Sequence, residues 1–184
     1  MSHNNILMIH EFKKSFLNLP LEDYTLTFDD GLYTQYKFFN KIKNIKTKKY
    51  FFISSGIVCP EDVEQSDEFI TCAQAHKKAF KGDFSNYMKW SQINEINKTE
   101  NCFIGCHSHF HMRKTADCVE CIISDNRYML NDFSKHLGKI PDIFCFPYNK
   151  ETGLYKEILF KKGFTEFFGD KRINIDDILN EKCN

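Results

Sequence analysis

Short apolar runs alternate along the chain with longer segments of helical periodicity, and this alternation constrains the fold more than any other feature. The apolar runs have the length of buried strands, and turn residues follow them. They cover residues 6–9, 24–28, 50–54, 102–106 and 143–146. Strands that alternate with helices are typical of an α/β domain with a mainly parallel sheet. Ligands of such domains bind beyond the carboxyl ends of the strands.

Four segments have apolar residues at helical spacing and are expected to form helices. They are residues 36–45, 90–96, 121–137 and 155–160. Gly138 follows the third segment and is expected to end its helix, because glycine readily adopts the left-handed conformation of a helix C-cap. Lysines occur throughout residues 37–49, and we interpret them as the solvated face of the first helix.

The chain has 184 residues, which predicts one domain spanning residues 1–184. Its 25 basic and 25 acidic residues give a formal net charge of zero. This balance argues against nucleic acid as a partner, because nucleic-acid-binding domains usually carry a basic excess. No apolar stretch reaches the length of a transmembrane segment. Nothing in the sequence predicts the oligomeric state.

Eight cysteines allow either disulfides or free thiols. The first residues lack the features of a signal peptide. We therefore expect a cytoplasmic protein with reduced cysteines. One alternative is a structural zinc site made by four of them; these are Cys102, Cys106, Cys118 and Cys121.

Two adjacent carboxylates, Asp29 and Asp30, follow the second apolar run and precede Gly31. Neighbouring side chains that leave a strand point in different directions. One carboxylate can therefore bind a cation while the other accepts a proton. The alternative is an ordinary turn, in which Asp and Gly are common.

Three histidines, His107, His109 and His111, lie within five residues at the end of the fourth run. All three share a face on a strand, whereas a helix or tight loop brings together His107 and His111 only. Imidazoles with a carboxylate are ligands that suit zinc. One Asp and two His would leave a coordination position open, as in catalytic zinc sites. The alternative is a set of solvated surface histidines.

These two clusters resemble motifs of the polysaccharide deacetylases, the NodB-homology or carbohydrate esterase family 4 proteins. Residues 27–31 read TFDDG and residues 107–111 fit HSxxH, the first and second motifs of that family. The pair, in this order and separation, is specific, whereas either motif alone would be weak. Further similarity, in residues 90–93, 137–141, 144–149 and 163–164, extends the resemblance over most of the chain.

The resemblance implies a deformed, incomplete (β/α) barrel and metal-dependent removal of acetyl groups from N-acetylated amino sugars. In the family pattern the first Asp is the general base, which corresponds to Asp29. The second Asp and the two His of the second motif bind the metal. These ligands correspond to Asp30, His107 and His111, and we expect zinc as the cofactor. His109 falls on a variable position.

Two positions depart from the common family pattern. The arginine of the third motif is replaced by Cys145 or Phe146, as in the branch similar to poly-N-acetylglucosamine deacetylases. In that branch the Tyr148 backbone N–H would be the oxyanion donor. The usual C-terminal histidine is also missing, and the N-terminal segment around His10 resembles the one that supplies the general acid there.

The resemblance leaves further alternatives open. Tyr148 could lie in a plain turn, and His10 could be a structural residue. Arg172 resembles an arginine of the same branch that would orient Asp29 or bind substrate, but we interpret it as a surface residue. Residues 59–89 match no family pattern and form either a wall of the groove or an inserted helix. Other functions are hydrolysis of a different C–N amide and non-catalytic glycan binding.

Overall fold

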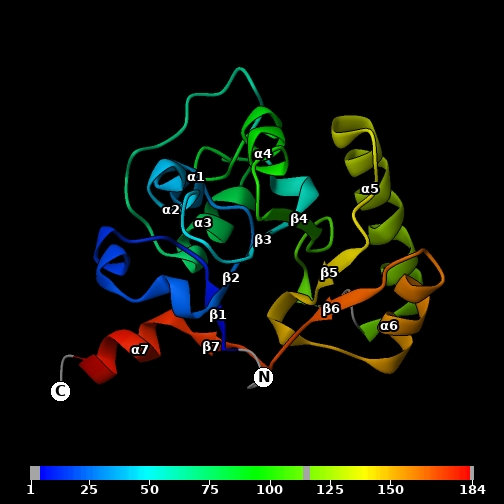
Figure 1. Cartoon of the computed structure of the whole chain (residues 1–184). Helices are drawn as coiled ribbons and strands as arrows, with labels where there is room; N and C mark the ends of the chain where they lie inside the picture. The colour runs from blue at the N-terminus through cyan, green and yellow to red at the C-terminus, as the bar shows by residue number, and fades with distance from the viewer. Residues whose placement is uncertain (1–4, 114–116, 183–184) are drawn as a thin grey trace.

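The fold is built on one parallel sheet, seen in the computed structural model, which describes residues 5–113 and 117–182. The strand order is β6-β5-β4-β3-β2-β1-β7, and each neighbouring pair is parallel. The strands are β1 Ile6–Ile9, β2 Thr25–Phe28, β3 Lys49–Ile53, β4 Cys102–Cys106, β5 Ile143–Cys145, β6 Glu166–Phe168 and β7 Ile173–Asn174. The sheet curls without pairing its edge strands β6 and β7 (Figure 1). This confirms the predicted α/β fold and its deformed, incomplete (β/α) barrel.

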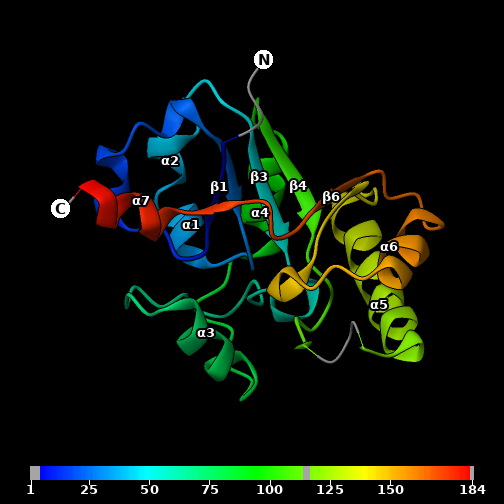
Figure 2. The same ribbon diagram turned by 90° about the horizontal axis from the view of Figure 1, so that it is seen from below.

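In the described part of the chain, seven α-helices accompany the curled sheet, and most of them cover its outside (Figures 1 and 2). They are α1 Tyr33–Lys37, α2 Phe39–Ile42, α3 Cys72–Ala79, α4 Trp90–Asn97, α5 Val119–Leu137, α6 Gly153–Phe160 and α7 Ile175–Lys182. As predicted, α5 ends at Gly138, which has a left-handed φ of 69°. No helix in the described part of the chain has both the length and the apolar character needed to cross a bilayer.

Both faces of the sheet are packed, and β3 shows why its sequence is an unbroken apolar run. Phe51 and Ile53 belong to the large core cluster between the sheet and its helices, whereas Tyr50 and Phe52 belong to a second cluster on the other face. Alternate residues of a strand point to opposite faces. A strand that is buried on both faces therefore has no polar alternation.

The first predicted helix, over residues 36–45, is wrong in its length. The structure divides it into α1 and α2 at Phe38, where φ is −98° and ψ is 2°. The lysines of residues 37–49 are mostly solvated, but Lys49 is fully buried on β3. Its Nζ donates hydrogen bonds to the carbonyls of Ile45 and Thr47 at 2.7 and 2.8 Å. Those bonds satisfy the ammonium group while its aliphatic stem packs inside.

Residues 59–89 contain α3, which begins with a capping box formed by Thr71 and Gln74. Figure 2 shows this helix near the carboxyl ends of the central strands, apart from the helices that flank the sheet. The two alternatives for residues 59–89, an inserted helix and a wall of the groove, are therefore both met by α3.

Candidate active site

The centre of the site is the Asp30 carboxylate, which follows β2 and is 1% exposed. Asp30 and Gly31 both have positive φ values, of 72° and 79°. This sharp turn occurs where the sequence supplies the Gly that such backbone tolerates best. Asp30 Oδ1 lies 3.2 Å from His107 Nε2 and 3.0 Å from His111 Nε2. One ligand atom from each residue lies within 4.8 Å of the other two.

Hydrogen bonds fix the loop that carries the two imidazoles. The backbone N–H groups of His109 and Phe110 donate to the buried Asp125 carboxylate, and His111 N donates to Ser108 Oγ. The His109 side chain turns away and contacts Ser55 Oγ through Nδ1 at 2.8 Å. The loop therefore selects His107 and His111, as expected for a tight loop and not for a strand.

The environment of each imidazole bears on its use as a ligand. His107 Nδ1 lies 2.8 Å from the Cys145 carbonyl, to which it can only donate, and this leaves Nε2 facing Asp30. Burial lowers the pKa of His107, but its neighbours, including the Asp30 carboxylate, outweigh burial and raise it well above the usual value. A proton and a cation would therefore compete for this imidazole. Burial lowers the pKa of His111, which favours its neutral form.

The donor set fits a divalent cation. Asp30 Oδ1 is buried and accepts no hydrogen bond in the described part of the chain, although two imidazole nitrogens lie within 3.2 Å of it. A carboxylate oxygen and two imidazole nitrogens that converge in this way are the ligands of catalytic zinc sites. Asp30, His107 and His111 are thus the residues that would hold such an ion.

Asp29 pairs with Arg172 inside the barrel, so the interpretation of Arg172 as a surface residue is wrong. Both side chains are 2% exposed, and the guanidinium binds both carboxylate oxygens at 2.7 and 2.8 Å. The same guanidinium donates to Thr27 Oγ1 and Asn149 Oδ1. Burial raises the pKa of Asp29, but Arg172 outweighs burial and the net shift is downward. Asp29 is therefore held ionised and oriented.

Replacing Arg172 with methionine is expected to destabilise the fold by about 3–5 kcal/mol, because it leaves the buried Asp29 carboxylate without its partner. The measurement is the free energy of unfolding in urea. The matched control is Lys161→Met, which removes an exposed ion pair with Glu157 and should cost less than about 1 kcal/mol. Equal effects of the two substitutions would contradict a structural role for the buried pair.

All six residues predicted for the site line one pocket of about 800 Å³ at the carboxyl ends of the strands. They are His10, Asp29, Asp30, His107, His111 and Tyr148. His10 follows β1, and Tyr148 follows β5 in a turn where its own φ is 57°. The Tyr148 ring packs on His111 with centroids 4.7 Å apart, and its hydroxyl donates to the His111 carbonyl.

Two residues of α3, Cys72 and His76, complete the surroundings of Asp30 and were not predicted. Cys72 Sγ lies 2.9 Å and His76 Nε2 3.4 Å from Asp30 Oδ2. The His76 ring also stacks on His111 at 4.4 Å. Their spacing of four residues places them on one face of a helix, but only the packing of α3 shows that this face meets Asp30.

The four-cysteine zinc site is not formed. Cys102 and Cys106 are the first and last residues of β4 and are buried, whereas Cys118 and Cys121 lie at the start of α5. None of the cation-binding groups found in residues 5–113 and 117–182 combines these four. All cysteines in those ranges are free, which agrees with the prediction of reduced thiols.

Comparison with known proteins gives one family and several similar folds. The sequence model of the family described as polysaccharide deacetylase matches residues 19–167. IcaB from Ammonifex degensii is 18% identical over 98% of this chain and 97% of its own, with a TM-score of 0.65. No curated protein matches the chain in sequence.

Two further solved structures are similar in fold. The Streptococcus pyogenes deacetylase PplD in complex with acetate is 11% identical over 88% of this chain and 80% of its own, with a TM-score of 0.61. The de-N-acetylase from Aggregatibacter actinomycetemcomitans is 13% identical over 92% of both chains, with a TM-score of 0.62. At these identities the likeness establishes the fold and leaves the chemistry to the site.

Proposed function

The chain belongs to the polysaccharide deacetylase family, and we propose that it removes the acetyl group from an N-acetylated amino sugar and releases acetate. Two similar structures support this reaction, since one is described as a de-N-acetylase and another as a deacetylase in complex with acetate. The substrate would be a glycan or a glycan precursor.

One observation carries the proposal. An ionised carboxylate, Asp29, lies directly beside a convergent set of cation ligands, Asp30, His107 and His111, in a single pocket. Amide hydrolysis needs a base for the attacking water and an electrophile for the carbonyl oxygen. A purely structural ion pair would not require a neighbouring carboxylate with two imidazoles directed at it.

Zinc is the cation we propose, because imidazole nitrogens with one carboxylate oxygen are typical zinc ligands. A bound zinc ion would act as a Lewis acid, lowering the pKa of water and polarising the acetamide carbonyl.

Each of the remaining roles belongs to a group that lines the pocket. Asp29 accepts the proton of the attacking water, and Arg172 holds its two oxygens in place for that transfer. The Tyr148 backbone N–H donates to the carbonyl oxygen as negative charge develops there. The turn that presents it is fixed by the N–H groups of Asn149 and Lys150, which donate to the carbonyls of Phe146 and Pro147.

His10 is the group we propose to protonate the leaving amine. Its backbone carbonyl accepts a hydrogen bond of 2.8 Å from the buried Gln35, which fixes the end of β1 beside the Asp29-Asp30 turn. Without a proton donor the sugar amine would leave as a poor anionic group.

Replacing His10 with asparagine is therefore expected to lower kcat by about 10²–10⁴-fold while the zinc ion held by Asp30, His107 and His111 is retained at one equivalent. Steady-state acetate release and metal analysis of the same preparation check this outcome. Turnover close to that of the original protein would contradict the role of His10 as the general acid and assign it a structural role.

The substrate class is tested by acetate release from a panel of amides, with protein loaded with one equivalent of zinc and Asp29→Asn as the inactive control. Oligomers of N-acetylglucosamine, a nucleotide-linked N-acetyl sugar and a lipid-linked one represent the proposed substrates. Small acetamides without a sugar represent the alternative, hydrolysis of another C–N amide. Release from sugars supports the proposal. Release only from small acetamides favours the alternative, and none from any amide favours a non-catalytic glycan-binding protein.

A further inference from the structure

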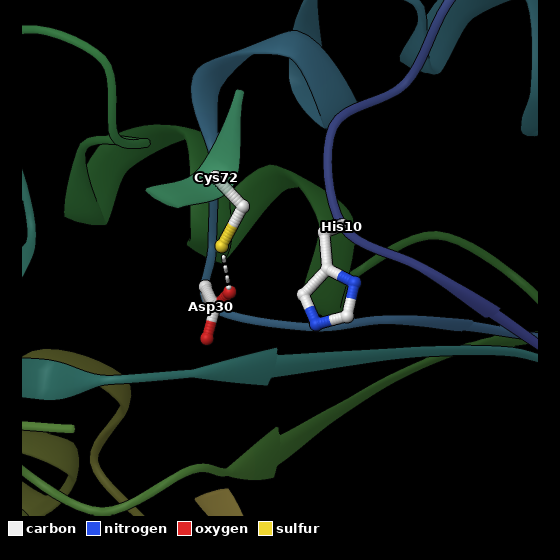
Figure 3. A group of neighbouring side chains, drawn as sticks. All are labelled: His10, Asp30 and Cys72. Atoms are coloured by element: carbon white, nitrogen blue, oxygen red, sulfur yellow. Dashed lines mark hydrogen bonds between the residues drawn. The ribbon is translucent and has the colours of Figure 1, made fainter. Parts of the chain in front are cut away.

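The Asp30 carboxylate has different neighbours at each of its two oxygens. Oδ1 faces His107 and His111, as described above, whereas Oδ2 faces Cys72 Sγ at 2.9 Å. A ligand atom from each of His10, Asp30 and Cys72 lies within 4.8 Å of the other two. Figure 3 shows the Cys72 thiol hydrogen-bonded to the Asp30 carboxylate, with the His10 imidazole beside them. A second set of three donors therefore shares Asp30 with the first.

Hydrogen bonds outside this second set hold its members together. Glu11, the neighbour of His10, accepts a bond of 3.1 Å from the backbone N–H of Cys72 and so ties α3 to the end of β1. The buried Gln35 Nε2 donates to the carbonyls of both His10 and Asp29, at 2.8 and 2.6 Å. Three separate segments are thus fixed relative to one another before any ion binds.

The donors have the chemistry of a zinc site. A thiolate, an imidazole and a carboxylate suit thiophilic and borderline divalent ions and do not suit magnesium or calcium. The Cys72 thiol donates a hydrogen bond to Asp30 Oδ2 through its proton. When an ion binds, that proton is released to solvent, as metal binding by thiols requires. Hydrolases with two metals commonly place them about 3.5–4 Å apart, a separation that a bridging carboxylate can span.

We propose that His10, Asp30 and Cys72 form a second cation site for a thiophilic divalent ion such as zinc, and that its occupation inhibits the enzyme. The inhibition rests on the proposed function, in which His10 protonates the leaving amine. An imidazole nitrogen bound to an ion cannot deliver a proton, so the ion removes the general acid. The first site, with His107 and His111, is filled at lower zinc concentration and supports activity.

Cobalt(II) is the probe for this site, because a thiolate ligand gives it a charge-transfer band in the near ultraviolet. The protein is titrated with cobalt while absorbance and bound metal are measured. Two ions per chain are expected, with the thiolate band appearing only as the second binds. The Cys72→Ser variant should bind one ion and give no band. The control, Cys121→Ser, removes an exposed thiol outside the pocket and should keep two ions and the band.

A band that grows with the first ion would overturn the proposal, since Cys72 would then be a fourth ligand of the first site. A single bound ion without a band would overturn it as well. Acetate release with one equivalent of zinc is measured separately. That assay alone decides the proposed function, whichever result the cobalt titration gives. At full occupancy of the second site, acetate release should drop by about 100-fold, and Cys72→Ser should relieve this inhibition.

Discussion

The Asp30→Asn variant is expected to retain no stoichiometric zinc and to release acetate only at the background rate. Asp30 is the shared carboxylate of both donor sets, with His107 and His111 at one oxygen and Cys72 at the other. A neutral amide keeps the shape of the side chain but neither its charge nor its ability to accept at both atoms. Metal analysis after dialysis, with acetate release from the same sample, measures both losses.

The control for this variant is Asp67→Asn, which changes an exposed aspartate that pairs with Lys37 at the surface. It should retain the zinc and the activity of the original protein. Near-ultraviolet circular dichroism should confirm that Asp30→Asn remains folded. If the folded Asp30→Asn variant keeps its full zinc content, the ion is bound elsewhere and the assigned centre is incorrect.

The second large effect is expected for Asp29→Asn, which should lower kcat by about 10²–10⁴-fold, the contribution typical of a general base. The carboxylate of Asp29 is kept ionised by Arg172, whereas an amide cannot accept a proton from water. Zinc binding should persist, because Asp30, His107 and His111 are unchanged. The variant thus separates proton transfer from metal binding, which Asp30→Asn does not.

Kinetic analysis of Asp29→Asn is made on zinc-loaded protein at a temperature where the variant is folded, since the amide weakens the buried pair with Arg172. Lowered kcat with zinc bound at one equivalent is the expected pattern. Activity within about threefold of the original, a difference of under 1 kcal/mol in the barrier, would mean that another group serves as the base.

Much of the site was predictable from the sequence because its residues follow strands. Parallel strands present their carboxyl ends at one edge, so residues that follow different strands meet there. His10 follows β1, Asp29 and Asp30 follow β2, and His107 follows β4. Strand position places these side chains at a common edge without any knowledge of the helices, and the resemblance to the deacetylase motifs selects His10 and assigns the roles.

Arg172 and Cys72 were beyond such reasoning because neither follows a strand. Arg172 precedes β7 and reaches Asp29 across 143 residues of sequence. An arginine next to Lys171 has the local appearance of a surface residue. Cys72 belongs to an inserted segment whose capping box predicts the start of a helix, but no local pattern tells against which part of the barrel that helix packs.

The predicted length of the first helix is wrong for a physical reason, the spacing of its apolar residues. Tyr36, Phe39, Ile42 and Ile45 recur every three residues, whereas one helical turn takes 3.6 residues. Each step falls short of a full turn, so the four side chains drift around the axis and cannot all face the core. The structure resolves this by ending α1 at Lys37 and starting a second short helix at Phe39.

The most direct test of the proposed deacetylation is the balance of its two products. Protein loaded with one equivalent of zinc is incubated with oligomers of N-acetylglucosamine, and acetate and free primary amine are measured together over time. Both products are expected in a one-to-one ratio, and Asp29→Asn is expected to yield neither above background. If protein loaded with one equivalent of zinc forms no acetate and no amine from these oligomers or from the other N-acetyl sugars, the proposed function is contradicted.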